Sequence, residues 1–170
     1  APEGLWEGEW LRLIAPIFLH ATMAHILMNS LALMYLGPSA EVHLGSANYG
    51  TLYLLSGVAG FCVSQLLGGG HSVGASCSLF GIMGASLVAK VLDCPVPKFA
   101  WRNSEVRRYA YIVLIYIGLG FIGLLGNMDN WGHLGGFILG ALLGGVFELW
   151  RRRGRVSHAG LLVVLALCAA

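Results

Sequence analysis

Apolar and small residues dominate five long segments of the chain, and short, more polar loops separate them. These segments run roughly over Ala21–Leu36, Tyr49–Leu67, Ser76–Lys90, Tyr109–Leu125 and Trp131–Trp150. A helix that crosses a bilayer needs about 20 predominantly apolar residues. The pattern therefore predicts an all-α fold, a polytopic transmembrane helical bundle with about five complete spans.

The segment from Ser76 to Lys90 is short for a full crossing. A short span usually begins below the bilayer surface, in a water-filled recess or inside other protein. At the other end of the chain, an apolar run from Gly160 predicts the start of a further, truncated helix. We therefore divide the chain into a helical core over residues 1–155 and the start of another transmembrane helix over residues 156–170.

Composition supports an integral membrane protein. Hydrophobic residues make up 57% of the chain and charged residues only 11%, whereas soluble domains carry about 25% charged residues. The few basic residues bracket apolar spans, so we expect no nucleic-acid partner. The scattered cysteines form no C-x-x-C pair, which disfavours a zinc site or a disulfide framework, and we expect no metal and no cofactor.

The basic residues predict an orientation in the bilayer. Nine of the ten Lys and Arg residues lie in two loops, one after the segment ending at Lys90 and one after Trp150. Loops rich in Lys and Arg remain on the cytoplasmic side. We therefore expect these two loops to be cytoplasmic, with the start of the Ser76 segment opening to the outer or luminal side.

Ser76 and His133 form the first candidate pair of site residues. Gly132, Gly136, Gly140 and Gly144 recur every four residues, which gives their helix one bare face that another helix can approach closely. The segment starting at Ser76 is also rich in small residues. Packing of the two helices would bring the hydroxyl to the imidazole, as in an activated serine nucleophile. The alternative for His133 is a structural hydrogen bond to a carbonyl or to water.

His25 and Asn29 form the second pair, because residues four apart share one helix face. Two hydrogen-bond donors aimed at one point suit a developing oxyanion. The alternative is a hydrogen bond that joins two helices. His20 and His25 lack the spacing of a zinc protease motif, and no two aspartates lie at one membrane depth. Asp129 is the only acid near His133, so we expect a dyad without a third, orienting carboxylate.

Three stretches in this order resemble the rhomboid family of intramembrane serine proteases. The stretch WLRLIAPIFLHATMAHILMN is similar to the first outer loop and second helix of that family, and GASCSLFGIMGA is similar to its G-x-S-G nucleophile motif. The stretch NWGHLGGFILG is similar to its sixth helix with the catalytic histidine. The resemblance covers about residues 8–150 and implies a rhomboid-like bundle that cleaves transmembrane protein substrates within the lipid bilayer.

Carried across residue by residue, the resemblance implies a role for each matching position. Ser76 would be the nucleophile and His133 the general base and then acid. The backbone N–H of Ser76 and the side chains of His25 and Asn29 would form the oxyanion hole. The positions expected to support this site are Gly74, Phe80 (stacked on the imidazole), Gly132 (allowing close approach) and His20 (in the first outer loop).

The sequence departs from the family pattern in two ways. Cys77 stands where the motif has its second glycine, and we expect this change to be tolerated with Ser76 remaining the nucleophile. The family's first core helix has no counterpart here, so we expect the chain to be a piece of a longer protein. Two other functions stay open: an inactive rhomboid-like protein that binds membrane clients, and a small-solute transporter, for which the chain lacks an inverted repeat.

Overall fold

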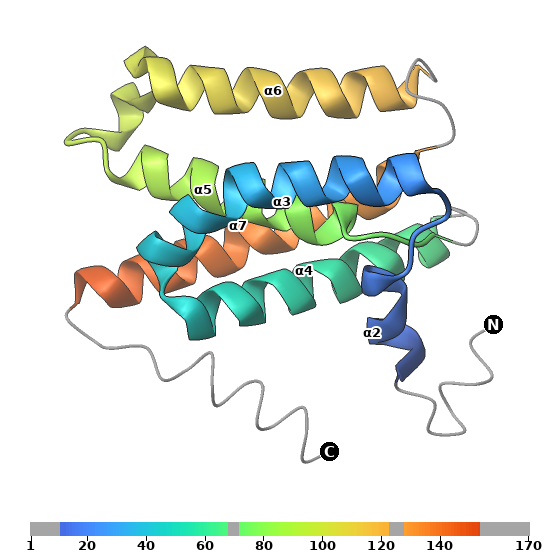
Figure 1. Ribbon diagram of the computed structural model, residues 1–170. Coiled ribbons are helices and arrows are strands. Elements are labelled where there is room, and N and C mark those ends of the chain that lie inside the picture. Colours follow the sequence, from blue (N-terminus) through green and yellow to red (C-terminus); the bar gives the residue numbers. More distant parts are fainter. Residues whose placement is uncertain (1–10, 68–71, 123–127, 154–170) are drawn as a thin grey trace.

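A computed structural model gives the structure of the chain, and it describes residues 11–67, 72–122 and 128–153. All regular elements in these ranges are helices, as the hydropathy pattern predicts (Figure 1). In chain order they are α2 (Leu11–Phe18), α3 (Met23–Leu44), α4 (Ser46–Leu66), α5 (Ser76–Leu92), the 3₁₀ helix η1 (Pro97–Arg102), α6 (Ser104–Phe121) and α7 (Asn130–Arg152).

Helix α5 occupies the centre of the bundle and packs on α3, α4, α6 and α7. Figure 1 shows α7 and α4 running along it, with α6 set apart on the other side. Small residues explain the central position: a Cβ on Gly140 would overlap the backbone of Gly81, and a Cβ on Gly144 would lie 2.5 Å from the Cα of Ala85. The glycine stripe therefore packs against the Ser76 helix, as the sequence predicts.

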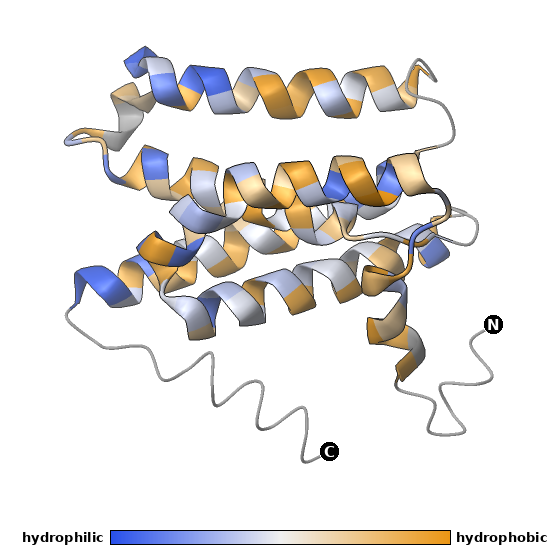
Figure 2. Cartoon of the chain, viewed as in Figure 1, coloured by the Kyte–Doolittle hydropathy of each residue, from blue (hydrophilic) through white to orange (hydrophobic). Residues whose placement is uncertain are grey.

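Two apolar clusters fill the space between the helices. The larger one contains Leu52, Ile82 and Phe147, from α4, α5 and α7. The smaller one lies toward the beginning of α5 and contains Ile17, Phe61 and Cys77. Outward-facing side chains are also largely apolar, and Figure 2 shows hydrophobic residues along the helices with hydrophilic residues concentrated near their ends. A molecule with this surface fits a lipid environment.

Within the described residues, α7 is the one helix with both the length and the apolar character to cross a membrane, at a mean hydropathy of 1.4. Helix α5 is apolar but has only 17 residues. Helices α3, α4 and α6 have the length, but polar residues lower their hydropathy, among them Asn29 and Asn48 in the interior and Arg107 at the start of α6. Five described helices thus correspond to the five predicted segments, and one of them is both long and apolar enough to cross a membrane.

The structure differs from the predicted segments in four places, one of which is that α6 begins at Ser104, five residues before the predicted Tyr109. Helix α3 continues past Gly37 and Pro38, where we expected a loop, and only Gly45 separates it from α4. The extension is held by packing, because Ala40 is buried in the larger cluster and Gly37 lies against the hydroxyl of Tyr49. Helix α2 and η1 were not predicted, and the predicted tail helix lies outside the described residues.

Candidate active site

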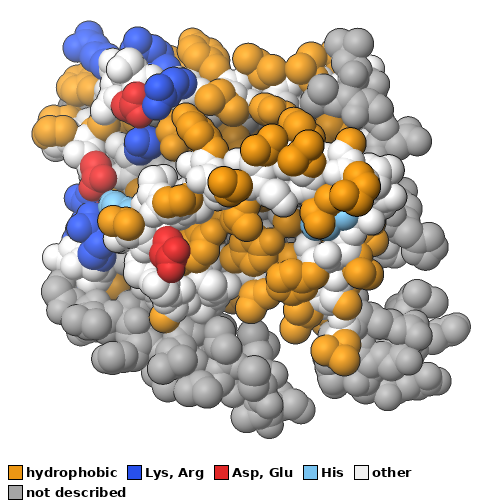
Figure 3. Space-filling model, viewed as in Figure 1, with side chains coloured by type: hydrophobic (Ala, Val, Ile, Leu, Met, Phe, Trp, Pro, Cys, Tyr) orange, Lys and Arg blue, Asp and Glu red, His pale blue; other side chains and the backbone are white. Residues whose placement is uncertain are grey.

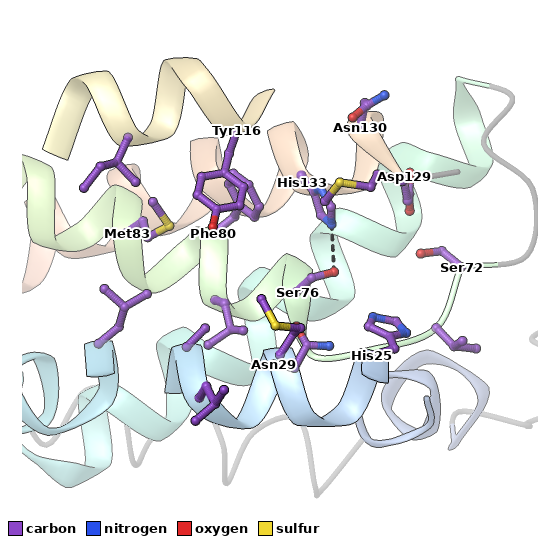
Figure 4. Close-up of a pocket in the computed structure, with 18 of the residues that line it drawn as sticks. His25, Asn29, Ser72, Ser76, Phe80, Met83, Tyr116, Asp129, Asn130 and His133 are labelled. Carbon is purple, nitrogen blue, oxygen red and sulfur yellow. Dashed lines mark hydrogen bonds between the residues drawn. The ribbon is translucent and has the colours of Figure 1, made fainter. Parts of the chain in front are cut away.

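Ser76 and His133 lie in hydrogen-bond contact at the beginnings of α5 and α7. The Oγ atom of Ser76 is 2.7 Å from Nε2 of His133 (Figure 4). When the imidazole is neutral with its proton on Nδ1, the hydroxyl donates to Nε2, which can then accept the proton. His133 is 5% exposed, so its ring is shielded from bulk water. This is the geometry of a serine hydroxyl beside a general base.

Phe80 and Gly132 are neighbours of the His133 imidazole that affect its orientation and its distance from α5. The rings of Phe80 and His133 are stacked at 4.5 Å between centroids, with 11° between their planes. Phe80 is one turn beyond Ser76 on α5, so a single helix presents both the hydroxyl and the ring that braces its partner. A Cβ on Gly132 would lie 3.0 Å from Sγ of Cys77 and would overlap the carboxylate of Asp129. Gly132 therefore allows α7 to approach α5 beside the dyad.

Asp129 is the N-cap of α7. Its Oδ1 accepts a hydrogen bond from the backbone N–H of Gly132 at 2.8 Å. Its Oδ2 is buried and has no hydrogen-bond partner among the described residues. Capping the first turn of α7 orients the helix that carries His133. Among the described residues, no carboxylate hydrogen-bonds to the imidazole of His133.

The first turn of α5 presents backbone N–H groups beside the Ser76 hydroxyl, and these groups have no backbone acceptor among the described residues. The first backbone hydrogen bond within this helix runs from Leu79 N–H to the carbonyl of Ala75, at 3.0 Å. The N–H groups of the three preceding residues therefore have no partner within the helix. They lie at the positive end of the helix dipole, which favours a negative charge.

Gly74 shapes the turn that precedes Ser76. Its φ is +120°, a region that side chains disfavour, and its N–H donates to the carbonyl of Pro16 in α2 at 2.8 Å. Space also requires glycine here, because a Cβ would lie 2.6 Å from Cε1 of His25 and 3.3 Å from Nδ2 of Asn29. Helix α2 thus anchors the loop, and Pro16 is a site neighbour that the sequence analysis missed.

His25 and Asn29 both extend from α3 toward this turn, opposite His133 (Figure 4). Asn29 is 8% exposed, and its Nδ2 has no hydrogen-bond partner within the described residues. An unpaired buried amide is costly and calls for a function. The alternative role for Asn29 was a hydrogen bond that joins two helices. Among the described residues, Nδ2 of Asn29 makes no such bond.

His20 stands behind His25. The two rings meet edge to face at 5.0 Å between centroids and 74° between planes. Both ring nitrogens of His20 are buried without a described partner. His20 contacts the proposed oxyanion residue and not the dyad. Among the described residues, no cluster of three His, Cys, Asp or Glu side chains could hold a metal ion.

Cys77 points away from the dyad. It is fully buried, and its sulfur occupies space that Gly60 of α4 and Gly132 of α7 leave open. A Cβ on Gly60 would lie 2.9 Å from this sulfur. Cys77, which replaces the motif glycine, thus fits because the facing residue on α4, 17 positions earlier in the chain, is Gly60. Nothing in the sequence analysis identified Gly60, because the contact joins two separate helices.

A cleft of about 1330 Å³ contains the candidate site at one end. It runs between α3 and α6, with α5 as its floor, and its walls are largely apolar. Residues that share one face of α5 line the floor, namely Ser76, Leu79, Phe80 and Met83. Near the site, Asn130 lies against Gly120 of α6, and Phe121 meets Trp131 edge to face at 5.4 Å. These contacts hold one end of α6 to α7.

Comparison with known proteins identifies the family and the class of fold. The sequence-family model of the Rhomboid domain matches residues 7–149 of the chain. The chain therefore belongs to the rhomboid family, which consists of integral membrane proteins. At the level of the family, this supports a serine protease that acts within the membrane.

Relatives from several kingdoms show the same similarity. The chain is 39% identical over 142 residues to RHOMBOID-like protein 1 of Arabidopsis thaliana, covering 83% of this chain and 35% of that protein. It is 35% identical over 166 residues to Rhomboid protease GluP of Bacillus subtilis, covering 95% and 31%. Rhomboid-type serine protease 2 of Emericella nidulans is 37% identical over 145 residues, covering 80% and 26%. The chain spans about a third of the length of these relatives.

Proposed function

We propose that the chain is an intramembrane serine endopeptidase that uses Ser76 and His133 as a catalytic dyad. The observation that carries this proposal is the 2.7 Å contact between Ser76 Oγ and His133 Nε2. Family membership supports the same reaction, because relatives with 35–37% identity are named rhomboid or rhomboid-type proteases. The substrates would be transmembrane proteins, and the reaction needs water but no metal or cofactor.

The reaction begins with attack on a peptide carbonyl. As Ser76 Oγ bonds to the carbonyl carbon, its proton passes to Nε2 of His133. The negative charge develops on the former carbonyl oxygen, beside the N–H groups at the start of α5 that have no partner within the helix. Nδ2 of Asn29 and the ring of His25 would donate from the opposite side. Such preorganised donors usually contribute the largest share of transition-state stabilisation.

Collapse of this intermediate breaks the C–N bond, and the proton on His133 goes to the leaving amine. Water then attacks the acyl ester with the same two groups in reversed roles, which releases the acid and regenerates the serine hydroxyl. The stacked ring of Phe80 keeps the imidazole in one orientation throughout. Each residue of this scheme comes from a helix, which holds the constellation more rigidly than loops would.

The cleft suggests how a transmembrane substrate reaches the dyad. A helix locks its own carbonyls in hydrogen bonds, so a scissile carbonyl becomes available only when the segment unwinds. The largely apolar slot between α3 and α6 can receive such a segment from the side, with its polar end at Ser76. By the positive-inside rule, the dyad would lie toward the outer or luminal face and the basic loops toward the cytoplasm.

Labelling by a serine-directed fluorophosphonate tests the proposal. The detergent-solubilised protein should label at Ser76, and Ser76→Ala should not label. An inactive client-binding protein would fail to label although it still retained transmembrane proteins. The unpaired Nδ2 of Asn29 favours the enzyme, because client binding by itself gives no reason for a buried donor beside a serine hydroxyl. Absence of labelling in the folded protein would leave client binding as the better account.

A further inference from the structure

Cationic side chains gather at the end of the molecule opposite the dyad (Figure 3). They come from the end of α5, from η1 and the start of α6, and from the end of α7. Helix α5 has 17 residues, so this end lies about 25 Å from Ser76 at 1.5 Å per residue. Charge here is thus well separated from the chemistry proposed for Ser76.

Most of these cations are neutralised by carboxylates. Arg151 and Arg152 hydrogen-bond to the fully buried carboxylate of Glu148, which also contacts His43 at 3.0 Å, and Arg152 reaches Asp93 at 2.8 Å. This cluster ties α3, α5 and α7 together.

The next two cations share one acid. Lys90 and Arg108 contact Glu105 at 3.5 and 2.9 Å. One carboxylate thus offsets one of these two positive charges within the protein.

Arg102 and Arg107 differ, because neither has an ion pair with a described carboxylate. Nη1 of Arg107 donates to the carbonyls of Trp101 and Arg102, at 3.2 and 2.9 Å. Its guanidinium is thereby fixed against the end of η1, while Nε and Nη2 have no described acceptor. The guanidinium of Arg102 lies over the ring of Phe99, at 5.3 Å from the centroid. Two uncompensated cations therefore belong to one short segment.

Exposed apolar and aromatic side chains flank these arginines. Phe99 is 50% exposed, Trp101 is 52% exposed and Val96 is 45% exposed. Trp101 packs edge to face on Tyr111, at 5.8 Å between centroids, which holds its indole beside the bundle. Tryptophan prefers the headgroup level of a bilayer, where one part of the ring is wet and the other apolar.

We propose that η1 and the start of α6 form a binding site for the phosphate of an anionic phospholipid, with Arg102 and Arg107 as its ligands. Arginine guanidinium groups match phosphate oxygens in geometry and charge. The aromatic residues favour a lipid over a free anion, because they require an interface to cover them. The site depends on the membrane location of the family and not on the proposed protease activity.

Thermal unfolding in micelles containing phosphatidylglycerol, phosphatidylcholine or added inorganic phosphate tests this site. A ligand that binds only the folded state raises Tm. Phosphatidylglycerol should raise Tm more than phosphatidylcholine does, and inorganic phosphate should have no effect. The double variant Arg102→Gln/Arg107→Gln should need about 30-fold more phosphatidylglycerol for half of the effect, from about 1 kcal/mol for each arginine–phosphate hydrogen bond lost. Ser76→Ala should respond as the unaltered protein does.

Arg153→Gln is the matched control, because it removes one charge from the same end of the molecule but outside the site. It should retain the response within about threefold, since it removes only diffuse attraction. An equal loss in Arg153→Gln, an unchanged response in the double variant, or an equal effect of both lipids would overturn the proposal. Stabilisation by inorganic phosphate alone would assign the arginines to a free anion instead.

A second measurement covers the case in which the double variant does not fold. Lipids with brominated acyl chains quench tryptophan fluorescence on contact, and Trp101→Phe isolates the contribution of Trp101. Brominated phosphatidylglycerol should quench that contribution more strongly than brominated phosphatidylcholine. Equal quenching by the two lipids would show an unselective interface and would contradict a phosphate site.

Discussion

The hydroxyl of Ser76 lies 2.7 Å from Nε2 of His133, although 57 residues separate them in the chain. The contact exists because α5 and α7 pack very closely. Glycines of α7 lie directly against backbone atoms of α5. Ser76 is the first residue of α5 and His133 lies in the first turn of α7, so the pair lies at the end of the packed interface. Both residues also line the cleft between α3 and α6.

We expect Ser76→Ala and His133→Ala each to abolish cleavage of a transmembrane substrate, by more than about 1000-fold. Groups that act as one unit are non-additive, so the double variant should be no slower than either single variant. The measurement is single-turnover cleavage of all three variants in proteoliposomes, with circular dichroism to establish folding. Activity above a few per cent in Ser76→Ala, or losses that multiply, would refute the dyad.

Asn29→Ala should lower kcat by roughly ten- to a thousand-fold with little change in KM, as for a lost oxyanion donor. Because Nδ2 makes no hydrogen bond among the described residues, the substitution should not lower Tm. Turnover and thermal unfolding of the same preparation distinguish a role as an oxyanion donor from a role in helix packing. An unchanged kcat with a lower Tm would instead assign Asn29 to helix packing.

Cys77→Gly should retain or improve activity, because the sulfur faces Gly60 and Gly132 and not the imidazole. The substitution removes a buried side chain, so we expect a loss of about 1 kcal/mol in the free energy of unfolding. Thiol alkylation of the folded protein should be slow, since Cys77 is fully buried. Activity that disappears in Cys77→Gly yet persists in Ser76→Ala would make the protein a cysteine protease.

Phe80→Leu should reduce kcat by up to about tenfold, because a stacked aromatic pair contributes about 0.5–1.5 kcal/mol. Phe147→Leu is the matched control, since both rings are 6% exposed and Phe147 lies in the larger core cluster, away from the dyad. The two variants should lose similar stability, while only Phe80→Leu slows turnover. Equal kcat values would assign Phe80 to packing alone.

Gly140→Ala should destabilise the protein by about 1–3 kcal/mol through overpacking, because its Cβ would overlap the backbone of Gly81. Gly145→Ala on the same helix is the control. The nearest atom to its Cβ would be Cγ1 of Val88, at 3.5 Å, so we expect it to be neutral or stabilising. Thermal unfolding of the two variants measures the difference, and equal Tm values would show that α5 and α7 can separate without cost.

The sequence was sufficient for five of the seven described helical elements, and it identified most of the residues now found close together at the candidate site. Hydropathy predicts five helices, and the beginnings of α5 and α7 fall within one residue of the predicted ones. Residues at a spacing of four necessarily share a helix face, so the glycine stripe, the Ser76–Phe80 pair and the His25–Asn29 pair could be inferred locally. The roles of these residues in catalysis came from the family resemblance and remain to be tested.

Only the tertiary structure decided the contacts between distant segments. Pro38 normally ends a helix, yet burial of Ala40 and the packing of Tyr49 on Gly37 hold α3 helical beyond it. The space for Cys77 depends on Gly60 of another helix. The anchoring of Gly74 by Pro16 depends on α2 lying beneath the loop. A local pattern reports which face of a helix is apolar or bare, but which neighbour covers that face is a property of the assembled bundle.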